Sequence, residues 1–129
     1  MTLFFVAIIA FLLIALVAWK FLLHGPRLSE NGKRKVLDHW KHAKSHQDAH
    51  RMLLEADAVV AELLQLIGFP GSMGDKLKKG STYLPDVDAV WRAHKLRNRI
   101  AHEPGLSIDP REAARAMAAF EAVIHKFCR

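Results

Sequence analysis

Two kinds of hydrophobic pattern divide the chain. From Leu3 to Trp19 no residue is charged and nearly all are apolar, and after Lys20 the apolar run continues to Leu23. Beyond Pro26 the apolar residues instead recur every three or four positions, which is the spacing of one face of an α-helix. No stretch alternates with a period of two residues. We therefore predict an all-α protein.

The first segment, residues 3–23, has the length of a membrane span. A helix rises ~1.5 Å per residue, so this segment matches a bilayer core of ~30 Å. Lys20 lies near one end, where its stem can reach the headgroups. A cleaved signal peptide is the alternative, but it would need a basic region before the apolar run and a better cleavage site than the Leu-Val-Ala run at 16–18. We predict a retained transmembrane anchor over residues 1–23.

Positive charge on the carboxyl side of this segment predicts its orientation. The cations that follow the apolar run are Lys20, Arg27, Lys33, Arg34 and Lys35. Short segments rich in Lys and Arg stay on the cytoplasmic side of a membrane. We therefore expect a single pass through the inner membrane, a short linker over residues 24–31 and a domain at 32–129 that faces the cytoplasm.

That domain is long enough for one hydrophobic core. Apolar stripes and breaks predict long helices over roughly 32–45, 48–67 and 86–102 and a fourth that starts at Pro110, with a short helix at 72–79. Expected caps are Ser29 or Asn31, then Asp48, Asp86 and Asp109. Since the connections are short, neighbouring helices must run antiparallel. The prediction is an antiparallel four-helix bundle with a short inserted helix.

Charge and cysteine content narrow the possible partners and the cellular compartment of this protein only partly. The formal net charge of +6 favours anionic partners such as RNA, nucleotides or acidic lipid headgroups. A membrane anchor that follows the positive-inside rule would explain the same charge, so charge alone does not select nucleic acid. The single cysteine, Cys128, excludes an internal disulfide framework and fits a reducing compartment.

The most specific motif is the run from Arg97-Asn98 to His102, at the end of the third long helix. Pro104 and Gly105 end the helix directly afterwards. A guanidinium, an amide and an imidazole grouped at a helix end can hold a phosphodiester and move its proton. The motif therefore indicates phosphate chemistry.

An ion pair between helices explains the same arginine without any catalysis. Glu55 and Asp57 lie among apolar residues of the second long helix, where a carboxylate needs a cation. Arg97 is a suitable partner for either of them. His102 would then only interact with the dipole at the carboxyl end of its helix.

The motif resembles that of the HEPN superfamily, all-α domains often found as ribonucleases of toxin and defence systems. Arg97-Asn98 followed by three residues and His102 matches the signature, and the similarity covers roughly residues 33–127. The segments that carry it are Glu55-Ala-Asp57, Met73-Gly-Asp-Lys-Leu77, Trp91, His94 to Glu103 and Arg111-Glu-Ala113. Taken together they look like small membrane-anchored HEPN-like proteins of bacteria.

This resemblance implies a metal-independent endoribonuclease that acts as a homodimer. His102 would move a proton at the ribose 2′-hydroxyl or at the leaving 5′-oxygen, and Arg97 would stabilise the charge on the phosphorane. Asn98 would orient the imidazole or bond the phosphate. Many HEPN domains are instead noncatalytic binding or dimerisation modules. The sequence identifies neither an RNA target nor a cognate antitoxin.

Two further groups of polar residues have a functional and a plain interpretation. The first group is basic and consists of Arg92, Lys95 and Arg99. It would contact the phosphates of an RNA backbone, or it is a solvated helix face without a ligand. Histidines recur at 39, 42, 46 and 50, a spacing that can bind zinc or nickel. A turn expected near residues 45–48 would split this row, and no well-placed carboxylate completes a site. We therefore assign no metal and no cofactor.

Three functions remain open from the sequence. The first is a membrane-tethered HEPN-like endoribonuclease that uses Arg97 and His102. The second is a noncatalytic module that dimerises or binds RNA or a nucleotide at the inner membrane surface. The third is a purely structural helical bundle beside the membrane.

Overall fold

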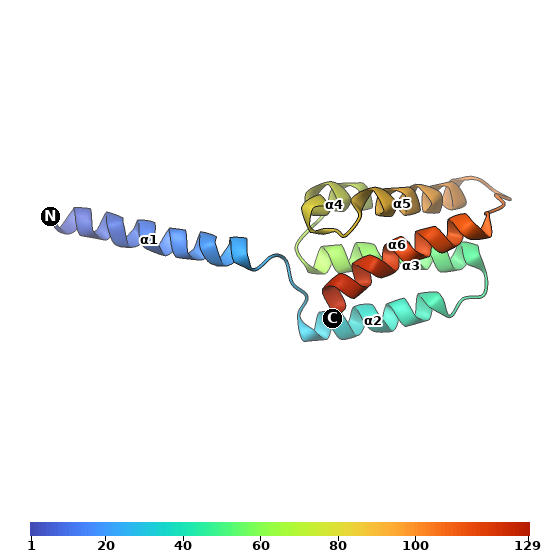
Figure 1. Cartoon of the computed structure of the whole chain (residues 1–129), viewed down its shortest axis with the longest axis horizontal. Helices are drawn as coiled ribbons and strands as arrows, with labels where there is room; N and C mark the ends of the chain where they lie inside the picture. The colour runs from blue at the N-terminus through green and yellow to red at the C-terminus, as the bar shows by residue number, and fades with distance from the viewer.

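The computed structural model describes the backbone of residues 1–129 and all side chains except that of Phe21, and this backbone is helical without strands (Figure 1). The α-helices are α1 (Thr2–Leu23), α2 (Glu30–Lys44), α3 (Ala49–Leu66), α4 (Met73–Gly80), α5 (Val87–His102) and α6 (Pro110–Cys128). A 3-10 turn, η1 (Ser81–Tyr83), follows α4. The prediction of an all-α protein is confirmed.

Helix α1 is separate from the other helices. By length and composition the segment Thr2–Lys20 is able to cross a membrane, and none of it is buried against the rest of the chain. Figure 1 shows α1 extending away from the packed helices. The large apolar side chains of α1 that the structure describes are exposed, so they add nothing to the core.

Short polar side chains mark where the other helices begin. The cap bonds run from the backbone N–H of Gly32 to Ser29, of His50 to Asp48, of Ala89 to Asp86 and of Arg111 to Asp109. The predicted caps are therefore confirmed, with Ser29 and not Asn31 in the first position. Ser72 and Asp75 also cap each other reciprocally at the start of α4, which keeps the pKa of Asp75 below its ordinary value.

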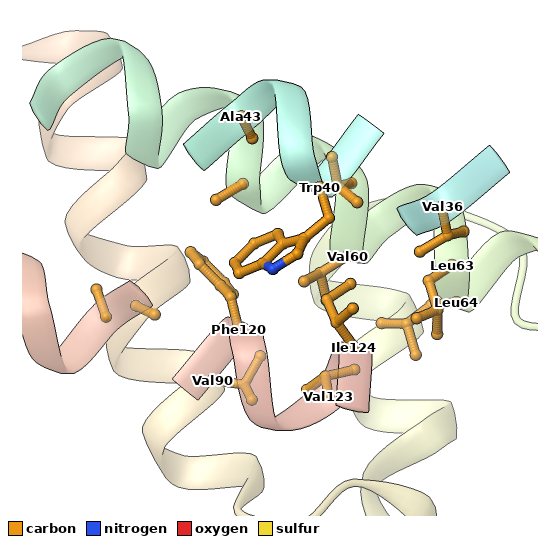
Figure 2. Close-up of a cluster of buried hydrophobic side chains, with 14 of the residues drawn as sticks. Val36, Trp40, Ala43, Val60, Leu63, Leu64, Val90, Phe120, Val123 and Ile124 are labelled. Atoms are coloured by element: carbon orange, nitrogen blue, oxygen red, sulfur yellow. The ribbon is translucent and has the colours of Figure 1, made fainter. Parts of the chain in front are cut away.

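Helix α3 lies at the centre of the packed helices. It contacts α2, α5 and α6 along its length and α4 near its end, while α5 also packs on α6. Successive long helices run in opposite directions (Figure 1). Figure 2 shows the indole of Trp40 beside the ring of Phe120, above Val123 and Ile124. Leu28 is buried in the same core, so the core begins before α2 does.

The packed helices have two distinct ends. Gly25 and Arg27, which follow α1, lie beside Tyr83 and the last residues of α6, and we call this the linker end. The opposite, far end holds the end of α2, the start of α3 and the end of α5. There the imidazole Nε2 of His50 lies 2.7 Å from the carbonyl oxygen of Leu106. The residues of the Arg-Asn…His motif therefore lie toward the far end, away from the linker.

Charged pairs line the edge between α2 and α3. Oε1 of Glu62 lies 2.7 Å from Nζ of Lys35, and its Oε2 lies 2.6 Å from Nδ1 of His39. Desolvation raises the pKa of Glu62, but the hydrogen bonds from Lys35 and His39 outweigh it, so the pKa lies below its ordinary value. The ionised carboxylate therefore helps to hold α2 on α3.

The unfolding free energy of the Glu62→Gln variant should depend less on pH in the acidic range than that of wild type. Because the folded state lowers the pKa of Glu62, its contribution is complete above the unfolded value of 4.5 and is lost as the pH falls through the folded value. Urea unfolding of the full chain in detergent micelles, followed by tryptophan fluorescence between neutral pH and pH about 3, measures this loss. The variant should be less stable than wild type at neutral pH and lose less on acidification.

Asp38→Asn is the matched control, because it removes an exposed carboxylate of α2. Its acid dependence should follow wild type. An equally steep acid loss in Glu62→Gln and wild type would contradict the role of this pair.

Candidate functional site

Four polar side chains of α3 and α5 form a closed ring at the interface between these helices. Nδ1 of His94 lies 2.8 Å from Oδ1 of Asp57, and Nε2 of His94 lies 3.3 Å from Nδ2 of Asn98. Nη1 of Arg97 donates to Oδ1 of Asn98 at 3.2 Å. Nε of Arg97 lies 3.5 Å from Oδ2 of Asp57 and closes the ring.

The donors and acceptors of this ring agree with one another. A carboxylate only accepts hydrogen bonds, so Nδ1 of His94 carries the hydrogen that points at Asp57. Nε2 of His94 faces the amide nitrogen of Asn98, and the amide oxygen of Asn98 accepts from Arg97. Asp57 and His94 are largely buried, with side chains 6% and 12% exposed. A buried network of three hydrogen bonds and one ion pair ties α5 to α3 at this depth.

Arg97 is only partly available to a ligand. Its Nε is buried without a well-aligned hydrogen bond, whereas 35% of the side chain remains exposed. The ion pair expected for this arginine therefore forms with Asp57. Glu55 takes no part in it, because it lies against His46 and Arg51 on the α2 side of α3.

His102 and Arg97 occupy different faces of α5. His102 is the last residue of α5 and is exposed, and the chain turns away at Gly105, whose φ is +73°. Residues five apart on an α-helix are rotated by about 140° from each other. Asn98 bonds His94 and Arg97, so the structure brings together Arg97 and Asn98 and leaves His102 apart from them within one chain.

A basic groove of about 350 Å³ runs between α5 and α6. Its cations are Arg92, Lys95 and Arg99 of α5 and Arg115 of α6. Small and apolar side chains, among them Ala93 and Leu96, form its floor, and one acid, Glu112, lies 3.4 Å from Nη1 of Arg99. The groove thus concentrates positive charge over an apolar base.

His102 shares a helix face with part of this groove. Lys95, Arg99 and His102 follow one another at intervals of four and three residues, which keeps them on one side of α5. The three RNA-binding residues expected from the sequence therefore lie together, next to the exposed imidazole. Arg115 joins them from α6, and only the packing of α6 on α5 could reveal this.

His94 is the residue of the polar ring that the sequence did not assign to the candidate site. Two signals in the sequence pointed to it: it precedes Asn98 by four residues, and it lies on the side of α5 that also carries Arg97. Trp91 is half-buried, packs its ring edge-on to His94 and lines a shallow pocket with Arg92 and Lys95. It therefore belongs partly to the core and partly to the basic surface.

Comparisons with family models, with curated proteins and with solved structures found no match to this chain. The geometry of α5 and its neighbours is the ground for a functional proposal. Its main features are the basic groove between α5 and α6 and the polar ring between α3 and α5.

Asp57→Ala should destabilise the domain more than the loss of one exposed contact would. It leaves the buried imidazole of His94 without its acceptor and Arg97 without its ion-pair partner, which costs about 1–3 kcal/mol of unfolding free energy. Asp57→Asn keeps one acceptor oxygen, so its unfolding free energy should lie between those of wild type and Asp57→Ala. Urea unfolding of the full chain in micelles measures all three proteins.

The control is Asp88→Ala, since Asp88 is an exposed acid on α5. Its unfolding free energy should stay within about 0.5 kcal/mol of wild type, as is usual for surface positions. If Asp57→Ala were as stable as Asp88→Ala, the ring would not hold α5 on α3.

Proposed function

We propose that this chain is a HEPN-like antiparallel four-helix bundle, tethered by α1 to the inner membrane, that binds RNA through the basic groove between α5 and α6. One observation carries the proposal: Arg92, Lys95 and Arg99 of α5 and Arg115 of α6 line the same groove. Cations supplied by two helices can contact successive phosphates of one strand. Each phosphate that they neutralise releases counterions, and this release favours binding. Such binding positions a strand without reading its sequence.

The tether and its orientation rest on α1 and the charges after it. A helix with the length and composition of a span and no buried face fits a retained anchor. Lys20, Arg27 and Lys33 follow it, so the bundle faces the cytoplasm by the positive-inside rule. RNA is then on the same side of the membrane as the groove.

The position of the groove favours RNA over acidic lipid headgroups. Gly25 and Arg27 attach α1 to the linker end, so a bilayer around α1 meets that end first. Arg99 and His102 lie toward the far end of α5, about 15 Å or more along the helix from its start. A flexible polyanion can follow cations along this length, whereas a flat membrane surface at the linker end cannot.

Replacing the four groove cations by glutamine should weaken RNA binding and its dependence on salt. Each phosphate contact contributes about 0.7 to the slope of log affinity against log salt for a single strand, so losing four contacts removes up to about 3. Fluorescence anisotropy with a labelled single-stranded RNA, at several salt concentrations, measures the slope. The full chain is used in nanodiscs of zwitterionic lipid, which excludes attraction by the membrane.

A control with the same charge change replaces four cations outside the groove, Arg34, Lys41, Lys78 and Lys79. It should keep most of the wild-type affinity and slope. Equal losses in the two variants would mean that net charge, and not the groove, attracts RNA, which contradicts the proposal.

Endoribonuclease activity is the second candidate, and the exposure of His102 beside Lys95 and Arg99 favours it. The imidazole is open to solvent on a face where RNA would lie, and Arg97 keeps a third of its side chain exposed. Since the two side chains leave α5 in different directions, one scissile phosphate would be held between two copies of the chain. The activity is therefore proposed for a homodimer.

His102→Ala and Arg97→Ala should each slow RNA cleavage in EDTA by at least about 100-fold, as loss of a proton-transfer group or of a charge stabiliser does. His125→Ala removes an exposed histidine of α6 and should leave the rate unchanged. Gel analysis of a labelled RNA measures cleavage. If wild type binds RNA through the groove but does not cleave it, only the binding function remains. If His102→Ala still cleaves RNA at the wild-type rate, His102 does not transfer the proton.

A further inference from the structure

Three side chains with metal-binding atoms meet at the far end, outside the groove and the polar ring. His42 and His46 come from the end of α2 and the connection after it, and Glu55 comes from α3. Nε2 of His46 lies 2.7 Å from Oε2 of Glu55, and Nε2 of His42 lies 3.6 Å from the same oxygen. All three candidate ligand atoms lie within 4.8 Å of one another.

These separations are close to those of a tetrahedral metal site. Imidazole nitrogens and carboxylate oxygens bind zinc at about 2.0–2.2 Å, which places neighbouring ligand atoms about 3.3 Å apart. The two distances to Glu55, 2.7 and 3.6 Å, fall on either side of this value. His42 is 67% exposed, so a rotation of its side chain can bring the two imidazoles closer without disturbing the core.

The way in which α2 ends creates this arrangement. Although α2 stops at Lys44, Ser45 keeps helical dihedral angles of −74° and −15°, and the N–H of His46 still bonds the carbonyl of Ala43. His46 therefore remains one turn after His42, on the same side. The short connection to Asp48 then returns the chain along α3, which places Glu55 opposite both rings.

The ion-pair interpretation leaves one atom unexplained. His46 is 14% exposed, and its Nε2 is buried without a well-aligned hydrogen bond despite its closeness to Glu55. The other carboxylate oxygen, Oε1, lies 3.4 Å from Nε of Arg51. A ring nitrogen of His46 and a carboxylate oxygen of Glu55 thus face the same small volume.

We propose that His42, His46 and Glu55 bind a divalent transition-metal ion, with zinc as the favoured occupant. Two imidazoles and one carboxylate suit zinc, and the three ligands leave a fourth position for water on the side of the exposed His42. Arg51 weakens the attraction of a dication, but it also fixes the carboxylate through Oε1 and leaves Oε2 to the metal. The ion would clamp α2 to α3 at the far end.

The test titrates Zn²⁺ into the full chain, without a histidine tag, in detergent micelles. We expect one zinc per chain by calorimetry, and Co²⁺ in its place should show the intense visible absorption of four-coordinate cobalt. His42→Ala, His46→Gln and Glu55→Gln should each weaken zinc binding at least about 10-fold, since loss of even a second-shell partner does as much. Binding should also weaken on acidification, because protons compete with the metal for its ligands.

His39→Gln is the matched control. His39 lies one turn earlier on α2 and pairs with Glu62, so its loss removes a histidine from the same edge and should leave zinc affinity unchanged. His42 is exposed, so His42→Ala should melt at the wild-type temperature without metal and still lose the zinc-induced rise in melting temperature. Absence of zinc binding by wild type, or equal affinity in His42→Ala and His39→Gln, would overturn the proposal.

Discussion

The position of α3 among its neighbours is the constraint on which the rest of the structure depends. Leu53, Val60, Leu63 and Leu64 are all fully buried, because α2, α5 and α6 cover most sides of this helix. A helix covered in this way can keep a carboxylate only where a neighbour supplies positive charge or a hydrogen-bond donor. The acids of α3 therefore lie at its edges with α2 and α5.

Each of these acids meets a different set of basic partners. Glu62 faces Lys35 and His39 of α2, and Glu55 faces His46 near the end of α2. Asp57 points the other way, toward His94 and Arg97 of α5. The same requirement thus produces a row of charged pairs, a cluster of two histidines and a glutamate, and a polar ring. Their chemistry differs because burial and the number of imidazoles differ from one to the next.

Helix α5 is divided between two tasks. One side presents His94 and Arg97 to Asp57, which fixes the helix on α3. Another side presents Lys95, Arg99 and His102 to solvent beside α6. The two halves of the Arg-Asn…His motif fall on different sides, so a function that needs both must recruit a second chain. The proposed RNA binding along the groove needs only one chain, because all four cations of the groove belong to that chain.

The sequence alone determined the helices, because apolar spacing, capping residues and Gly or Pro breaks act over a few residues. It also identified residues 3–23 as long and apolar enough to cross a membrane, and it identified the basic residues of α5. It further indicated that Glu55 or Asp57 needs a cation and that Arg97 can supply it. Only the tertiary structure decided that this carboxylate is Asp57, that His94 joins them and that Arg115 completes the groove. It also placed Glu55 against His42 and His46, although the end of α2 predicted a split row. These outcomes depend on which helix faces which neighbour and at what rotation, and that is set by packing between residues far apart in the chain.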